Sequence, residues 1–360
     1  MDNPAEAAVQ QAMRNSAYDR ALAVLRAGHD QMVADLIRLT EIPAPPFHEA
    51  ERARAFRDMA EAVGLSDVTI DGAGNVTGLR RGTGSGLVCV AAHLDTVFPA
   101  GTDVTVRREG TRLMAPGIGD DTRSLAVLLA WLRAMDEAAI RTRADLLFVA
   151  DVGEEGPGDL RGMRHLFQQG PYAGRIDAFI TVDSPDMDHI VTGGVGSKRY
   201  RVSFRGPGGH SYGAFGQVNP MYAMADAIQR LARLVVPSSP RTTYSAGVTG
   251  GGTSINSIPN LVWTEFDLRS ESASELARLE QQFLNLVGAA VDSENAARAT
   301  RNGAIVYEAK KIGDRPAGHT DDTALLPQLA RAALRAHGFN PSFEYSSTDA
   351  NIAMSLQIPA

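Results

Sequence analysis

The stretch that decides the fold is LVCVAAHLD, residues 87–95. Residues 87–92 are apolar without interruption, which is typical of a strand buried on both faces of a sheet. His93 and Asp95 follow at once, and side chains two residues apart on an extended chain point the same way. Open α/β sheets place their sites at the C-terminal ends of their strands. The stretch therefore predicts a helix-covered sheet with a polar site at its edge.

The rest of the first half repeats this pattern of strands and helices. Two further apolar runs have the length of buried strands, and shorter strands and amphipathic helices lie between them. The sequence thus predicts an α/β fold, a mixed sheet flanked by helices. The expected strands are 68–70, 76–80, 145–151 and 178–183, and the expected helices are 18–40, 49–63 and 124–138.

The pattern of expected strands and helices changes near Thr192. Gly193, Gly194 and Gly196 resemble a linker that can act as a hinge. The order that follows is β-α-β-β-α-β, a small α+β unit inserted into the first domain. Its expected elements are 199–205, 219–234, 242–248, 261–269, 274–292 and 304–309. A helix at 321–337 and a short tail return to the first domain, so the predicted domains are 1–193 with 310–360, and 194–309.

Composition excludes several classes of protein. A chain of 360 residues with 44% hydrophobic and 21% charged residues fits two globular domains. The net charge of −7 argues against a nucleic-acid or anionic-membrane partner. The single cysteine, Cys89, lies in the buried run, which predicts a structural residue and a reducing compartment. Because there is neither a signal-peptide pattern nor an apolar span of membrane length, we expect a cytoplasmic protein.

Three more acidic segments accompany His93. GIGDD at 117–121 precedes a helix, DVGEEG at 151–156 follows a strand, and Asp183 ends another strand. Taken one at a time, these acids also fit a helix cap, a solvated loop and a turn. Together, four strand ends that deliver His, Asp, Glu-Glu and Asp predict a two-metal site. Imidazole and carboxylate ligands suit zinc, and cobalt or manganese are alternatives.

The inserted domain has its own candidates. The glycine-rich turn GPGGHS, 206–211, presents His210, and the loop 250–259 presents Asn256. Arg269 ends a strand and can hold a carboxylate through two parallel hydrogen bonds. A surface turn histidine and a surface salt bridge are the alternative interpretations of His210 and Arg269.

At this point the motifs resemble a known family, the two-zinc peptidases that include carboxypeptidase G, tripeptidase T, dipeptidases and aminoacylases. The tripeptidase T-like branch is the most similar. The motifs cover nearly the whole chain in family order: 93–97, 117–121, 154–156, Asp183, 208–211 and 252–259. The resemblance implies a zinc exopeptidase-like catalytic domain with an inserted lid domain that also dimerises.

The resemblance also implies a role for each residue of the metal site. His93 and Asp183 hold one zinc, and Asp120 bridges two zincs and is followed by a cis peptide. Glu155 holds the other zinc, while Glu154 is the general base that deprotonates the metal-bridging water and then protonates the leaving amine. Asp95 supports His93 from behind.

In the lid, His210 reaches the active site of a partner copy and steadies the oxyanion, while Asn256 and Arg269 bind substrate. The implied function is zinc-dependent hydrolysis of an amide or peptide bond in a small substrate with a free carboxylate, by a homodimer. An N-acyl amino acid or ureido acid is an alternative substrate. A non-catalytic dimeric binding protein on the same scaffold is the alternative of another class.

Two departures from the family pattern stand out. Thr122 follows the acid pair where many relatives have Lys, which marks a subgroup. The segment 346–360 matches the family's closing segment, and the family's last His ligand normally lies beyond it. His319 and His337 lie in the wrong context to replace that ligand. We therefore expect either a natural protein longer than this chain or an impaired form whose Glu155-bound zinc lacks a ligand.

Overall fold

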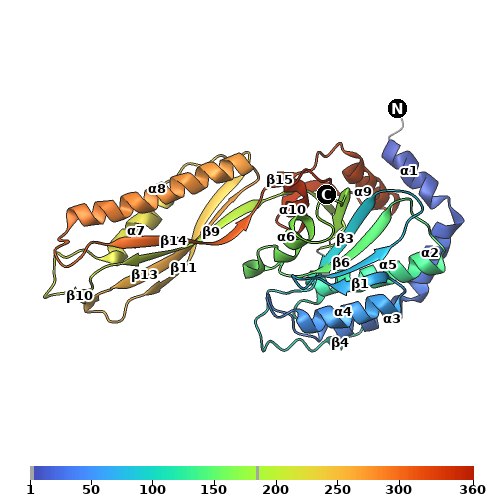
Figure 1. Ribbon diagram of the computed structural model, residues 1–360, viewed down its shortest axis with the longest axis horizontal. Coiled ribbons are helices and arrows are strands. Elements are labelled where there is room, and N and C mark those ends of the chain that lie inside the picture. Colours follow the sequence, from blue (N-terminus) through green and yellow to red (C-terminus); the bar gives the residue numbers. More distant parts are fainter. Residues whose placement is uncertain (1–3, 184–185) are drawn as a thin grey trace. The chain divides into compact units, whose positions relative to one another are not determined.

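The computed structural model describes residues 4–183 and 186–360, which form two compact units (Figure 1). Unit 1 contains the residues up to Gly194 and those from Gly318 to Ala360, and unit 2 contains Val195–Ala317. The predicted boundary at residue 309 falls inside strand β14 (Val306–Arg315), because this strand pairs with its neighbour as far as Arg315. Unit 2 therefore extends beyond its predicted end.

Unit 1 is built on a mixed sheet of five strands, as the sequence predicts. The strand order is β1 (Ser66–Ile70), β2 (Val76–Arg80), β6 (Asp145–Asp151), β3 (Leu87–His93) and β7 (Ala178–Thr181). β3 is central and runs parallel to β6 and β7, whereas β1 and β2 are antiparallel. The three parallel strands end at one edge, and this is where the polar motifs emerge.

The alternation of side chains along β3 explains why it is apolar throughout. Val90 and Ala92 join one hydrophobic core, and Cys89 and Ala91 join the other. Successive side chains of a strand point to opposite faces, so a strand covered by helices on both sides has no solvent face. Cys89 is fully buried, and burial raises the pKa of its thiol, which agrees with the predicted structural role.

Helices cover both faces of this sheet (Figure 1). Phe56 of α4 (Ala50–Ala62) and Leu128 of α5 (Arg123–Glu137) pack in the first core. The second core takes residues from α6 (Arg161–Gln168) and α10 (Ala350–Ser355). The other elements of unit 1 are α1 (Pro4–Met13), α2 (Ser16–Ala27), α3 (His29–Thr40), α9 (Leu325–Ala336), β4 (Arg107–Glu109), β5 (Arg112–Met114), β8 (His189–Gly194), β15 (Gly318–His319) and β16 (Ser342–Ser346).

One local prediction needs correction, and another needs more detail. The expected helix 18–40 is two helices, α2 and α3, which meet at Gly28. The chain passes from unit 1 to unit 2 at the expected glycine linker, but the glycines belong to strands, since Gly193 and Gly194 end strand β8 and Gly196 begins β9 (Gly196–Arg205). A Cβ atom at Gly193 would lie 2.2 Å from the Tyr345 ring, so close packing requires this glycine.

Unit 2 is an antiparallel sheet with two helices on it. The strand order is β11 (Thr242–Gly251), β13 (Leu261–Ser270), β9 and β14. Helices α7 (Pro220–Leu231) and α8 (Ala273–Ala297) bury Phe283, Val287 and Ala227 against residues such as Val202 and Phe266 of the strands. β10 (Gly209–His210) and β12 (Ser257–Ile258) form a small separate ribbon. Within residues 4–183 and 186–360, no helix is long and apolar enough to cross a membrane.

Candidate metal centre

The predicted ligands meet at the C-terminal edge of the three parallel strands. His93 is the last residue of β3, the segment with Glu154 and Glu155 follows β6, and Asp183 lies two residues beyond β7. Asp120 arrives differently from the prediction. It lies in the turn Ile118–Thr122 that leads into α5, and the strand before it, β5, belongs to a separate two-stranded ribbon. Three strand ends and one helix-leading turn therefore supply the site.

The distances bring the candidate ligands close to the spacing of a metal site. The Nε2 atom of His93 lies 3.0 Å from Oδ1 of Asp120 and 4.0 Å from Oδ1 of Asp183. Ligand atoms of these three residues all lie within 4.8 Å of one another, and so do those of His93, Glu154 and Glu155. Ligands about 2 Å from one ion lie at most about 4 Å apart, so small inward movements suffice to close each group. A donor set of one imidazole and several carboxylates fits zinc and its divalent alternatives.

The His93 ring is oriented by a backbone group. Its Nδ1 atom lies 2.9 Å from the carbonyl oxygen of Asp95. A carbonyl only accepts, so Nδ1 carries a hydrogen, and Nε2 is the ring atom that faces Asp120 and Asp183 and would offer its lone pair to a bound cation. Asp95 thus lies behind His93, where its backbone carbonyl makes the hydrogen bond and Oδ1 of its carboxylate is 3.8 Å from Nδ1.

The Asp95 carboxylate holds the glutamate segment. Its Oδ1 accepts hydrogen bonds from the amides of Gly153 and Glu154 at 2.8 and 3.0 Å, and its Oδ2 accepts from Glu155 at 2.8 Å. Asp95 is fully buried, so these charge-assisted bonds are its main compensation for lost water. Gly153 has φ +74, in the left-handed region that favours glycine. Asp95 thus sets where both glutamates leave the backbone.

The charges of the cluster favour the binding of a cation. Burial opposes protonation of His93, but the hydrogen bond with Asp120 and the neighbouring carboxylates outweigh it, so the pKa of His93 lies well above its usual value. The same hydrogen bond lowers the pKa of Asp120. Burial and the adjacent Glu154 carboxylate raise the pKa of Glu155 to about 7. Crowded carboxylates of this kind are stabilised when a divalent cation lies among them.

The residue after Asp120 was not anticipated. The Asp120–Asp121 peptide bond is cis, as the resemblance implies. Asp121 is buried and its Oδ2 accepts a hydrogen bond from the His93 amide at 3.1 Å. Thr122 is buried too, and its hydroxyl donates to the carbonyl of Gly117 at 2.8 Å. The turn is therefore tied to β3 through Asp121.

Two buried carboxylates beneath the site were also missed. Asp151 ends β6 and Asp349 precedes α10, and both are at most 1% exposed. Burial raises the pKa of Asp151 to about 7 and that of Asp349 well above its usual value. An acid that closes an apolar strand was the available signal for Asp151. No comparable signal marked Asp349, because its neighbour in space lies almost 200 positions away in the sequence.

His210 and Asn256 lie together in unit 2. β10 pairs with β12, and the amide of Ser211 donates to the carbonyl of Asn256 at 2.9 Å. The His210 side chain is exposed, and its Nδ1 accepts from the amides of Tyr212 and Gly213, which leaves Nε2 directed outward. The structure thus brings the predicted oxyanion-stabilising residue, His210, and the predicted substrate-binding residue, Asn256, side by side.

Arg269 lies elsewhere in the same unit. The loop that carries Asn256 enters β13 at Leu261, and Arg269 is the ninth residue of that strand, about 27 Å further along. Figure 1 shows β10 beyond the opposite end of the sheet. The Nε atom of Arg269 donates to Asp267 at 2.7 Å. A small substrate therefore cannot contact Arg269 and the pair of His210 and Asn256 in the same copy of unit 2.

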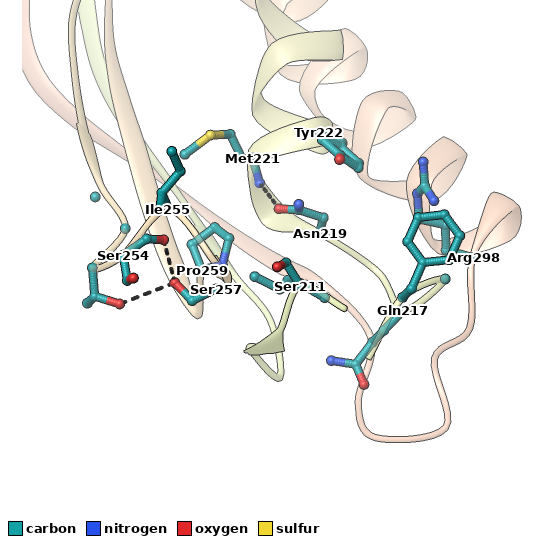
Figure 2. Close-up of a pocket in the computed structure, with 16 residues that line it drawn as sticks. Ser211, Gln217, Asn219, Met221, Tyr222, Ser254, Ile255, Ser257, Pro259 and Arg298 are labelled. Carbon is teal, nitrogen blue, oxygen red and sulfur yellow. Dashed lines mark hydrogen bonds between the residues drawn. The ribbon is translucent and has the colours of Figure 1, made fainter. Parts of the chain in front are cut away.

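A pocket lies beside His210 and Asn256 (Figure 2). Its volume is about 640 Å³, and its wall includes Ser211, Ser254 and Ser257. Asn219 caps helix α7 at its rim by accepting from the Met221 amide at 3.0 Å. The wall contains no His, Asp, Glu or Cys, so it lacks the usual side-chain ligands of a metal. The candidate metal ligands are therefore those of the cluster around His93.

Comparison with known proteins shows the family of this chain. The profile of peptidase family M20/M25/M40 matches residues 89–360, so the chain belongs to that family. The resemblance inferred from the motifs is thereby confirmed. A curated relative, the succinyl-diaminopimelate desuccinylase of Thiobacillus denitrificans, is 28% identical over 219 residues, which are 54% of either protein. The chain thus spans about half the length of the curated relative that it matches.

Solved structures share the fold. The aminopeptidase PepT of Bacillus cereus is 21% identical, with a TM-score of 0.72 over 92% of this chain and 88% of that one. A tripeptidase of Staphylococcus aureus is 19% identical, with a TM-score of 0.75 over the same shares. A dinuclear metal binding peptidase of Bacillus subtilis is 16% identical, with a TM-score of 0.63 over 93% and 87%. The predicted mixed α/β architecture is therefore that of the family.

Proposed function

We propose that the protein is a metal-dependent hydrolase that cleaves an amide bond in a small substrate with a free carboxylate. The observation that carries this proposal is the gathering of His93, Asp120, Asp183, Glu154 and Glu155 at one sheet edge. We assign His93 and Asp183 to one ion, Asp120 to the bridge, and Glu155 to the second ion. Zinc is the proposed metal, and cobalt or manganese fit the same donors.

Glu154 is the proposed general base. When bound, the two ions polarise the scissile carbonyl and make the attacking water more acidic. Glu154 is 5% exposed, follows the Asp95-held turn, and has its carboxylate within 4.8 Å of ligand atoms of His93 and Glu155. Its carboxylate takes a proton from water as the new C–O bond forms. It then gives that proton to the departing nitrogen as the C–N bond breaks, which balances the hydrolysis.

A homodimer accounts for the separation of the substrate-binding residues. Arg269 is proposed to hold the substrate carboxylate, and His210 and Asn256 are proposed to act in the site of a second copy. The separation of about 27 Å along β13 supports this division of labour. Near His210, the side chains of Tyr212, Phe215 and Ile255 are 89%, 86% and 103% exposed. Large apolar groups exposed together are typical of a surface that a partner covers.

Two comparisons support the proposed substrate class, one with solved structures and one with the curated relative. Tripeptidases and aminopeptidases with this fold favour a small peptide. The desuccinylase relative favours an N-acyl amino acid, since its name describes removal of a succinyl group. Both substrates present an amide next to a free carboxylate, and ureido acids do as well. Rates on di- and tripeptides against rates on N-acyl and N-carbamoyl amino acids separate these candidates.

The test is a Glu154→Gln variant assayed on that panel after loading with zinc. The substitution keeps the size of the side chain but removes its basicity, so we expect the rate to fall by roughly 100-fold or more. Glu61→Gln, on the exposed face of α4, is the matched control and should keep the parent rate. An unchanged rate in Glu154→Gln would contradict the assignment of the base. A folded parent that binds no zinc would instead support the binding-protein alternative.

A further inference from the structure

Arg52 is the one arginine among the largest fully buried side chains of the described residues. It lies on α4 and is 1% exposed. Its Nη1 donates to the carbonyl of Leu94 at 2.7 Å, and its Nε and Nη2 donate to the carbonyl of Ile42 at 2.9 and 2.6 Å. A longer contact of 3.4 Å reaches the carbonyl of Thr40. The guanidinium therefore joins the end of α3 to the segment that directly follows β3.

The partners of this cation are unusual. Each of these hydrogen bonds goes to a backbone carbonyl, and within the described residues Arg52 forms no ion pair with a carboxylate. Burial lowers the pKa of Arg52 to about 10, and the charge of Asp95 acts in the opposite direction. A buried charge without an ion pair destabilises the folded protein. Packing alone therefore does not explain why the Arg52 cation lies beside the acidic cluster.

The carbonyl that Arg52 holds belongs to the residue between two residues of the candidate metal centre. Leu94 is the residue between His93, whose ring faces the other ligands, and Asp95, whose carboxylate holds the Glu154 and Glu155 amides. The Leu94 amide donates to the carbonyl of Asp151 at 2.7 Å, so this residue is held on both sides. A rotation of the Leu94–Asp95 peptide would move the carbonyl that orients His93 and the carboxylate that holds the glutamates.

We propose that Arg52 is a positioning residue for the metal centre: by holding the Leu94 carbonyl, it fixes His93 and Asp95 in the geometry that their ligand groups need. It touches no ligand atom and acts only through the backbone. The planar guanidinium suits this task because it spans two backbone segments at once. A lysine keeps the charge, but its single nitrogen cannot hold the carbonyls of Ile42 and Leu94 with the same geometry.

The experiment compares Arg52→Lys with two controls in the full chain. Arg54→Lys makes the same change two residues away on the exposed side of α4. Phe56→Leu removes core packing from the same helix but leaves the guanidinium of Arg52 and the Leu94 carbonyl that it holds chemically unchanged. Zinc affinity is measured by calorimetry, ligand geometry by the visible spectrum of the cobalt-loaded protein, and kcat and KM on the best substrate of the panel.

We expect Arg52→Lys to lose roughly 10- to 100-fold in zinc affinity and in kcat, with a changed cobalt spectrum and little change in KM. Both controls should keep the parent spectrum, even where Phe56→Leu lowers the unfolding temperature. A folded Arg52→Lys with the zinc affinity, spectrum and kcat of the parent would overturn the proposal. An Arg52→Lys that fails to fold while Phe56→Leu folds would also overturn it, because Arg52 would then serve stability alone.

This inference rests on the proposed function, and the two fail in different ways. If the parent binds zinc and hydrolyses the substrate but Arg52→Lys equals it, only the positioning role is lost. If the parent binds neither zinc nor cobalt, both proposals are refuted. If the parent and Arg52→Lys differ in zinc affinity but neither hydrolyses any substrate of the panel, the positioning role stands and the proposed reaction does not.

Discussion

Asp95→Asn tests whether one carboxylate sets the position of the glutamate segment. The change keeps the shape of the side chain and one oxygen. That oxygen can still accept from the amides of Gly153 and Glu154, as Oδ1 of Asp95 does now. The new NH2 group replaces Oδ2 and faces the Glu155 amide, which now donates at 2.8 Å. Two donors then meet where a charge-assisted hydrogen bond existed.

The expected loss of stability follows from these contacts. A hydrogen bond to a charged group contributes about 1.5–3 kcal/mol, and the two remaining bonds weaken because the charge is gone. We therefore expect the free energy of unfolding to fall by about 3 kcal/mol. A typical protein has roughly 5–15 kcal/mol to lose, so the variant should remain folded at 25 °C. Since Glu155 must move away from the new NH2 group, zinc affinity and kcat should fall by roughly 10- to 100-fold.

The assay combines urea unfolding with zinc titration and steady-state kinetics. Asp177→Asn is the matched control, because Asp177 accepts the amide of Leu87 at 2.8 Å at the other end of β3. The two ends of this strand are about 20 Å apart. The control should lose stability but keep zinc affinity and kcat. An Asp95→Asn variant that loses 3 kcal/mol yet retains parental zinc affinity would refute the idea that Asp95 places the glutamates.

Three further predictions concern metal, pH and substrate. Removal of zinc with a chelator should lower the unfolding temperature, since free zinc at 100 times its Kd stabilises the folded state by about 2.7 kcal/mol; identical melting curves would count against the metal centre. Because burial raises the pKa of Asp151 to about 7, the folded metal-free protein holds a proton that the unfolded chain releases near pH 4, so its stability falls as pH rises from about 4 to 7. Above pH 7 the free energy of unfolding is lower by roughly 4 kcal/mol than at pH 4 because of this group. In Asp349→Asn the new NH2 group can donate a hydrogen bond to the ionised Asp151. This variant should therefore be more stable than the parent in urea unfolding at pH 8 and hardly more stable at pH 4. Arg269→Lys should raise KM at least about tenfold with kcat nearly unchanged, because it weakens a contact that is equally strong in the bound substrate and in the transition state. A fall in kcat alone would instead indicate that Arg269 takes part in the chemical step.

Much of the fold was readable from local patterns. The run 87–92 predicted a strand covered on both faces, and its residues indeed divide between two cores. The prediction is incomplete where a residue type has two uses. The glycines near 193–196 predict a hinge, and the boundary between the two units lies there, but Gly193 and Gly194 also allow Tyr345 and Asn351 to pack against their backbone. Sequence cannot distinguish these uses, because the packing partners lie about 150 positions away.

The sequence by itself determined which chemical groups this protein can bring to a metal. His93, Asp120, Glu154, Glu155 and Asp183 were recognisable because imidazole and carboxylate groups beside glycines and strand ends are local features.

Only the tertiary structure decided how these groups are held. The Asp95 carboxylate binds three amides almost 60 positions away, and Arg52 holds a carbonyl 42 positions away. Backbone donors and acceptors are the same at every residue, so no pattern of side chains shows which of them will meet. Their pairing appears only when the sheet and its helices are in place.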